Sequence, residues 1–306
     1  MSAQSFEPSG ILLINKHAGA TSHDIVYKVR RAMHTKRVGH TGTLDPMATG
    51  VLVVLVGRAA KACEYVSHDR KVYRATLRLG ITTDTEDTTG AVLTTSDALP
   101  SPAEVAEICK RFVGKIEQIP PMYSALKVDG QKLCDLARKG IEVERKARPI
   151  EIYALSCEST DSPADYMLTV DCSGGTYIRT LCADIGAALG CGGAMATLER
   201  VQTGGFTLDE CVTTAELEQL DDDARIAQLR PVQVLFAELP AVNLSDFYAR
   251  LCRNGCEIYQ GKIRTDFPVG QRVRICDAHG HFFALGEVRE YENGTAIAMI
   301  KLFELE

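Results

Sequence analysis

The feature that most restricts the fold is the apolar run at residues 50–57 (GVLVVLVG), which directly follows a loop rich in Gly and Thr. A helix that crosses a bilayer needs about 20 apolar residues, so this run is far too short to span a membrane. Its Val and Leu content and its bounding glycines are typical of a buried β-strand. We therefore expect a folded protein with this strand in its core and no contact with a membrane.

Other segments add short strands and helices in a mixed order. Residues 10–15 (GILLIN) predict a buried strand, and the alternation in residues 72–79 (VYRATLRL) predicts a half-buried antiparallel strand. Helical patterns at residues 102–113 and 181–189 interrupt the strands without a strict βαβ rhythm. This order favours an α+β fold with a mixed, largely antiparallel sheet.

A basic helix is predicted after the first strand, with Ser22 as its N-cap. Its apolar face is followed by a set of basic residues with no acid among them, which favours contact with phosphates. The alternative is an ordinary solvated helix face, on which acids are normally interspersed. The basic residues are Lys28, Arg30, Arg31, Lys36 and Arg37.

The net charge of −6 alone argues against a nucleic-acid partner, but the charge is unevenly distributed. Residues 1–150 hold 22 Lys and Arg against 16 Asp and Glu, whereas residues 151–306 hold 12 against 24. The first half therefore carries +6 and the second −12. This distribution permits a basic, anion-binding surface in the first half.

An acidic stretch at residues 201–224, followed by Pro231 and Pro240, marks the expected domain boundary. We expect a catalytic domain at residues 1–240 and a small C-terminal domain at residues 241–306. Short strand-like runs separated by glycines predict a β-rich barrel or sandwich for the smaller unit.

The eleven cysteines show no C-x-x-C pair. Residues 1–10 have neither the basic region nor the apolar segment of an export signal, so we expect reduced thiols and a cytoplasmic protein. Cys252 and Cys256 have the spacing of half a metal site on a helix. No second pair completes it, and we expect no metal.

The loop at residues 39–50 (GHTGTLDPMATG) presents one carboxylate, Asp45, close to His40. It lacks the Lys-Ser/Thr of a P-loop, and no G-x-G-x-x-G follows a strand, which argues against nucleotide binding. On physical grounds alone, an Asp before a Pro is most often a turn former that bonds its own backbone.

Four ordered blocks resemble the bacterial tRNA pseudouridine synthase B family, whose members isomerise uridine-55 in the T loop of tRNA. They are the loop at 39–50 and residues 71–75 (KVYRA), 120–125 (PPMYSA) and 175–181 (GTYIRTL). The resemblance is strong over residues 10–206. It implies the pseudouridine synthase fold, and the C-terminal unit resembles the PUA RNA-binding domain by position.

The resemblance implies that Asp45 is the catalytic carboxylate, that Arg179 pairs with it, and that Tyr73 stacks on a uracil flipped out of the T loop. Asp45 would attack the sugar or the base, or remove a sugar proton, and the sequence does not choose among these. By the same resemblance His40, Tyr177 and Leu198 contact the RNA or line the uracil pocket. No cofactor or metal is implied, and a monomer that binds the tRNA T stem-loop is expected.

Two departures from the family pattern concern RNA contacts and one turn. His17 stands where proline is usual, and residues 198–202 (LERVQ) are less basic than in the family. Residues 128–148, with six Lys and Arg, are the expected substitute for the lost phosphate contacts, unless they form a solvated surface.

Two other functions stay open at this level. The first is a tRNA-folding chaperone whose isomerase activity is dispensable. The second is an RNA-cleaving enzyme that uses His40 with Asp45. The nuclease needs a second His or a Lys as general acid, and His23 and His34 are not arranged to suggest one.

Overall fold

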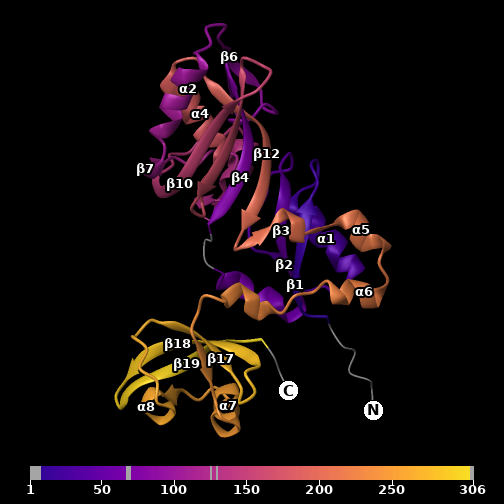
Figure 1. The fold of residues 1–306 in the computed structure, drawn as a ribbon, viewed down its shortest axis with the longest axis vertical. Helices are drawn as coiled ribbons and strands as arrows, with labels where there is room; N and C mark the ends of the chain where they lie inside the picture. The colour runs from indigo at the N-terminus through magenta and orange to yellow at the C-terminus, as the bar shows by residue number, and fades with distance from the viewer. Residues whose placement is uncertain (1–7, 67–69, 125, 129, 304–306) are drawn as a thin grey trace.

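A ten-stranded sheet, the main sheet, dominates the structure (Figure 1), a computed structural model that describes residues 8–66, 70–124, 126–128 and 130–303. Its strand order is β14-β1-β3-β12-β4-β11-β10-β7, with β2 paired to β3 and β13 to β12. Neighbouring strands are antiparallel except β1 with β14 and β3 with β12. The predicted α+β class with a largely antiparallel sheet is therefore confirmed. The strands are β1 (Gly10–Lys16), β2 (Val38–His40), β3 (Thr49–Val56), β4 (Lys71–Leu79), β7 (Gly114–Gln118), β10 (Arg148–Ser159), β11 (Asp165–Cys172), β12 (Gly193–Thr203), β13 (Phe206–Thr207) and β14 (Val212–Thr213).

Both faces of the sheet are covered, which explains the unbroken apolar run in β3. Leu52, Val54 and Val56 face a core that includes helices α1 (Ser22–Ala32), α2 (Pro102–Lys110) and α4 (Ile178–Leu189). Val51, Val53 and Leu55 face a second cluster, shared with the 3₁₀-helices η1 (Gly57–Glu64) and η3 (Val232–Phe236) and with the C-terminal domain. A strand buried on both sides needs no polar alternation.

The start of α1 corrects one prediction. Thr21, not Ser22, is the N-cap: its side chain accepts from the backbone N–H of Asp24, and the Asp24 carboxylate accepts from the N–H of Thr21. Ser22 is buried instead, and its Oγ contacts the backbone of Leu44 in the loop at residues 41–48. The first turn of α1 is thereby tied to that loop.

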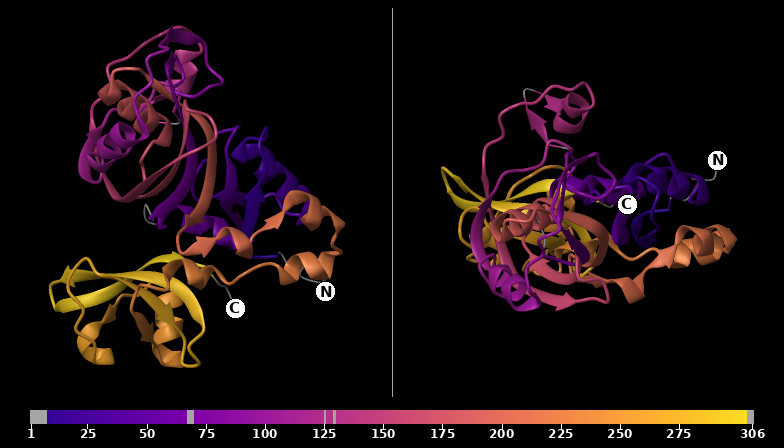
Figure 2. Two further views of the ribbon diagram at one scale, coloured as in Figure 1. Left: turned by 45° about the horizontal axis from the view of Figure 1, so that its top comes forward. Right: turned by 90° about the horizontal axis from the view of Figure 1, so that it is seen from above.

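Smaller elements extend from this body. The hairpin of β8 (Lys127–Val128) and β9 (Gln131–Lys132) with helix α3 (Leu133–Ala137) projects away from it (Figure 2, right). The acidic stretch at residues 201–224 belongs to this body, because its strand β14 pairs with β1 and extends the main sheet. The other elements are β5 (Ile81–Thr83), β6 (Val92–Thr95), η2 (Leu208–Glu210), α5 (Thr214–Gln219) and α6 (Asp222–Ala227).

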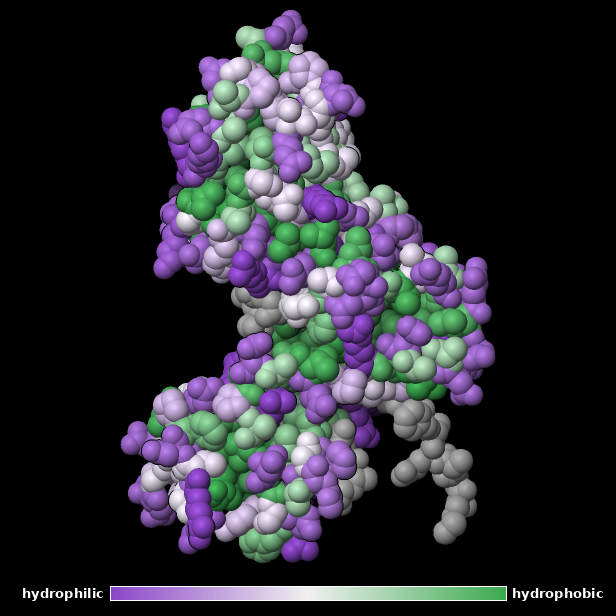
Figure 3. Space-filling model, in the orientation of Figure 1, coloured by the Kyte–Doolittle hydropathy of each residue, from purple (hydrophilic) through white to green (hydrophobic). Residues whose placement is uncertain are grey.

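A second sheet, with strand order β15-β17-β18-β19-β16, forms a small C-terminal domain with its own apolar core, as the predicted β-rich unit requires. Phe282 and Phe303 of this domain pack against Phe236 of η3, with ring centroids 6.0 and 5.8 Å from that of Phe236. The outline is indented between the two domains on the left of Figure 3. The elements are β15 (Ala241–Asn243), α7 (Asp246–Arg253), β16 (Ile258–Tyr259), α8 (Gln260–Ile263), β17 (Arg272–Cys276), β18 (Phe282–Tyr291) and β19 (Gly294–Leu302).

Across the part of the chain that the structure describes, none of the helices has the length and apolar character to cross a membrane.

Candidate active site

The loop at residues 41–48 lies between β2 and β3, and buried polar side chains hold it in shape. Ser22 Oγ lies 2.9 Å from the backbone N of Leu44, which donates to it, and donates to the Leu44 carbonyl at 3.1 Å. Lys16, fully buried, donates from Nζ to the carbonyls of Ala20 (2.7 Å) and Pro46 (3.2 Å). Because these bonds fix the backbone on either side of Asp45, its carboxylate is presented at a defined position.

Arg200, on β12, also holds the loop at residues 41–48 in place. Its side chain is only 1% exposed and donates from Nε to the Val51 carbonyl (2.8 Å) and from Nη2 to the Gly42 carbonyl (3.1 Å). Gly50 permits this approach: a Cβ there would lie 2.2 Å from the Arg200 carbonyl oxygen, and its φ is +103°. The support of the loop by Arg200 was not expected from the sequence, in which Arg200 follows Glu199 in a strand pattern without other charges.

Asp45 is paired with Arg179, which lies in the first turn of α4. Arg179 Nε donates to Asp45 Oδ2 at 3.0 Å, and Nη2 lies 3.5 Å from Oδ1. Nη1 donates to the Thr85 carbonyl at 3.0 Å, and Nη2 donates to the Tyr123 carbonyl at 2.7 Å. The arginine side chain is 5% exposed and the aspartate 36%, so a buried, fixed cation orients a carboxylate that remains accessible.

Asp87 is a second carboxylate beside Arg179, and the sequence analysis missed it. Its side chain is 9% exposed, and Oδ2 lies 3.9 Å from Arg179 Nε. Thr85 Oγ1 and the Thr89 backbone N–H donate to its other oxygen, which fixes its orientation. Its Thr-rich surroundings (TTDTEDTTG) resemble a surface turn, so nothing in the sequence distinguished it.

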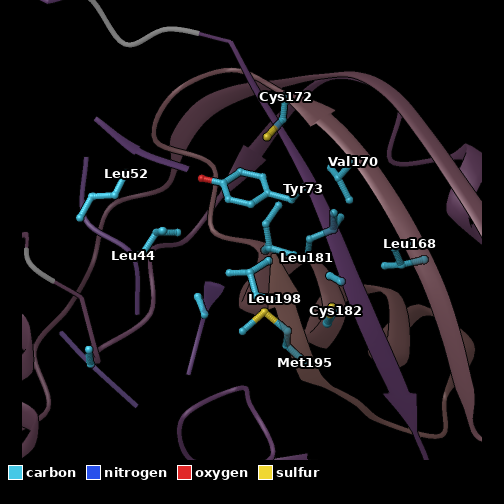
Figure 4. Packing of buried hydrophobic residues seen from close by; sticks show 14 of the residues in the cluster. Leu44, Leu52, Tyr73, Leu168, Val170, Cys172, Leu181, Cys182, Met195 and Leu198 are labelled. Atoms are coloured by element: carbon cyan, nitrogen blue, oxygen red, sulfur yellow. The ribbon is translucent and has the colours of Figure 1, made fainter. Parts of the chain in front are cut away.

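Tyr73, on β4, is buried beside Arg200 and lies within electrostatic range of Asp45. The ring packs among Cys172, Leu181 and Leu198, and its hydroxyl points to the side where Leu44 and Leu52 lie (Figure 4). Burial raises the pKa of Tyr73, and the positive charge of Arg200 partly opposes this. The phenol is therefore neutral near pH 7, and it can donate a hydrogen bond or offer its ring face to a planar base.

The remaining predicted residues surround this centre. Leu198 is 8% exposed on β12, and Tyr177 precedes α4, where its backbone is held by both side-chain amide atoms of Gln118. His40 ends β2, and its Nδ1 is buried without a hydrogen-bond partner among the described residues. Burial, and then the charge of Arg200, lowers the pKa of His40, so the imidazole is neutral at pH 7.

The arrangement combines an oriented carboxylate, a fixed cation, a neutral phenol and an apolar wall. Such a site suits reversible covalent or proton-transfer chemistry on a planar, uncharged group. No group of three or more His, Cys, Asp or Glu side chains is placed to hold a metal ion in the described ranges.

Comparison with known proteins first identifies the class. The model of the TruB family pseudouridylate synthase N-terminal domain matches residues 30–178, and that of the tRNA pseudouridylate synthase B C-terminal domain matches residues 179–237. The chain therefore belongs to the TruB family of pseudouridylate synthases.

Curated relatives narrow the comparison to one member of that family. Proteins named tRNA pseudouridine synthase B are 42% identical in Clostridium kluyveri, over 96% of this chain and 99% of the relative, and 41% identical in Alkaliphilus oremlandii, over 97% and 100%. Among solved structures, the Cbf5-Nop10-Gar1 complex matches with a TM-score of 0.73 at 23% identity, over 96% of this chain and 85% of the matched chain. That likeness supports the fold.

Proposed function

We propose that this protein converts uridine-55 of the tRNA T loop into pseudouridine. The observation that carries the proposal is the Asp45 carboxylate, held at 3.0 Å by buried Arg179 next to the neutral phenol of Tyr73. In the reaction the bond from C1′ to N1 of uracil breaks, the base rotates, and C1′ bonds to C5. The C5 proton is lost and N1 gains one, so there is no redox change and no net hydrolysis. We propose that the enzyme needs neither a cofactor nor a metal.

Asp45 is the proposed catalytic residue. An ionised carboxylate attacks C1′ or the base, or removes a sugar proton, and its distance to Arg179 is compatible with each role. The guanidinium keeps the carboxylate in one orientation. Arg179 is itself held by Thr85 and Tyr123, so it does not have to reorganise when substrate arrives.

The target base lies inside a folded loop, so it must be flipped out to reach Asp45. We propose that the ring of Tyr73 stacks on the extruded uracil and that Leu198 forms the apolar wall of its pocket. Tyr177 lines the same pocket. His40, neutral and with an unpaired Nδ1 among the described residues, takes the space or the hydrogen bonds that the flipped nucleotide leaves.

RNA binding is proposed to involve both parts of the chain. Residues 1–240 form the catalytic domain, and residues 241–306 form a PUA-like domain that contacts the tRNA beyond the T stem-loop. We propose that the protein acts as a monomer. All eleven cysteines are free thiols, which supports a cytoplasmic location, because a reducing compartment keeps them so.

The test is the Asp45→Asn variant, compared with Asp97→Asn, which changes an exposed aspartate in the same way. Each protein is incubated with an unmodified tRNA transcript, and pseudouridine, RNA binding and strand breaks are measured. We expect wild type and Asp97→Asn to form pseudouridine, and Asp45→Asn to bind normally without forming it. Activity that survives in Asp45→Asn would remove Asp45 from the mechanism, and strand cleavage by wild type would favour a nuclease.

A further inference from the structure

The basic helix predicted from the sequence has no part in the proposed active site, yet it lines a pocket of its own. A cavity of about 560 Å³ lies between the C-terminal half of α1 and the segment that carries α5 and α6. Its charged lining residues come from two separate parts of the chain: Lys28, Arg30, Arg31 and His34 from the first, and Glu218 and Arg225 from the second.

Positive charge prevails in this pocket. Four Lys and Arg side chains line it against Glu218, and Asp222 is the acid closest to its rim, 3.5 Å from His34 and 2.9 Å from Arg225. Two positive charges therefore remain without counting His34. Arg225 is held in place by bonds to the carbonyls of Leu217 and Glu218, both at 3.0 Å.

Arg30 lines the pocket and is anchored to the sheet behind it. Its Nη2 donates to the Val38 carbonyl at 3.2 Å, which fixes the guanidinium at the wall of the pocket. Basic residues in the last turn of a helix also favour its dipole, but this does not account for Arg225, which belongs to another helix.

We propose that this pocket binds backbone phosphates of the tRNA outside the T stem-loop, an inference that rests on the proposed function. Helix α1 has 11 residues, so at 1.5 Å per residue its C-terminal end, which lines the pocket, lies about 16 Å along the helix axis from Ser22, which contacts Leu44 in the loop at residues 41–48. That distance is within the reach of a folded RNA whose flipped base occupies the active site.

The position of the pocket indicates which part of the RNA it contacts. Helix α1 packs on the face of the sheet that also carries Tyr73 and Leu44. The C-terminal domain packs on the opposite face, and Figure 1 shows it at the lower left, whereas α1, α5 and α6 lie at the right edge. Because the proposed tRNA contacts of the C-terminal domain lie on that opposite face, the pocket is left for a different part of the tRNA.

The experiment uses the double variant Lys28→Gln with Arg31→Gln, because neither side chain lies in the loop at residues 41–48 that carries Asp45. The matched control is Lys110→Gln with Arg111→Gln, two exposed basic residues at the C-terminal end of α2. Affinity for an unmodified full-length tRNA and for an isolated T stem-loop is measured against salt concentration. Pseudouridine formation on the T stem-loop verifies that each variant is folded.

We expect the α1 double variant to bind full-length tRNA about tenfold more weakly at 0.1 M salt, with a log–log salt slope smaller by about 1.5. Its affinity for the T stem-loop should equal that of wild type, and the α2 control should match wild type on both RNAs. Unchanged affinity for full-length tRNA, or an equal loss on both RNAs, would overturn the proposal. If wild type forms no pseudouridine, the proposed function fails, while the two binding curves still decide the role of the pocket.

Discussion

Two buried arginines, Arg179 and Arg200, flank the loop at residues 41–48, and the groups around them differ in charge. Arg179 faces carboxylates: Asp45 at 3.0 Å and Asp87 at 3.9 Å, with Glu86 close enough for the charge of Arg179 to oppose the rise in its pKa that burial causes. Arg200 donates to backbone carbonyls and also interacts with the phenol of Tyr73. Burial lowers the pKa values of Lys16 and His40, and the positive charge of Arg200 adds to that effect.

The difference shows that the role of a buried cation depends on the groups that it contacts. A guanidinium that bonds a carboxylate fixes the orientation of a reactive group, and its loss should affect the rate most. A guanidinium that bonds carbonyls replaces missing backbone partners and fixes the shape of a loop, so its loss should affect stability most. Asp45 lies between the two, and variants at either arginine can separate these effects.

The largest effect is expected for Arg179→Lys. An ammonium cannot hold Asp45 while also bonding the carbonyls of Thr85 and Tyr123, so the carboxylate loses its fixed orientation. We expect pseudouridine formation to fall about 100-fold in single-turnover assays with saturating tRNA. Arg111→Lys, at an exposed position, is the control. A rate for Arg179→Lys within about threefold of the control would show that the pair is not needed for catalysis.

Arg200→Met should act mainly on stability. It removes the arginine donors to the buried Val51 carbonyl and the part-buried Gly42 carbonyl, and we expect the free energy of unfolding to fall by about 2–4 kcal/mol. Urea denaturation followed by circular dichroism measures this. Arg74→Met, an exposed position on the neighbouring strand β4, should change little. Equal midpoints for the two variants would contradict the role given to Arg200.

The smallest effect concerns Asp184, on the helix that carries Arg179. Burial, and then the charge of Glu86, raises the pKa of Asp184 from 3.8 to about 6. Because the folded state binds this proton more tightly than the unfolded state, the group lowers stability as pH rises from about 4 to 6, and the penalty persists above pH 6.

Asp184→Asn removes that penalty. We expect it to stabilise the protein by about 1–2 kcal/mol at pH 7.5, and by less at pH 4.5, where the wild-type carboxyl is mostly protonated. Thermal unfolding at both pH values measures the difference, with Asp97→Asn as the exposed control. A gain that is equal at the two pH values would mean that packing, not charge, is responsible.

The predicted elements and the site differ in how far the sequence specified them. Apolar spacing, which depends only on residues close together in the sequence, predicts several elements. These are the strands at residues 10–15, 51–56 and 72–79, the helix after Thr21 and the helix that begins at Pro102. The pairing of Asp45 with Arg179 was expected only from a family resemblance. Asp87 was missed because its sequence is that of a turn. Ser22 was misplaced by one position because Thr21 forms the capping box.

The sequence by itself determined the kinds of element, the glycine-rich loop before a buried strand and the uneven distribution of charge. Only the tertiary structure decided which charges meet. Asp45 and Arg179 are 134 residues apart, and the order β3-β12-β4 with α4 on one face brings them together. The same sheet order places Arg200 against the loop at residues 41–48 and leaves the basic C-terminal end of α1 beside α5 and α6. Spacing along the chain fixes local conformation, whereas ion pairs and pockets depend on how distant strands align.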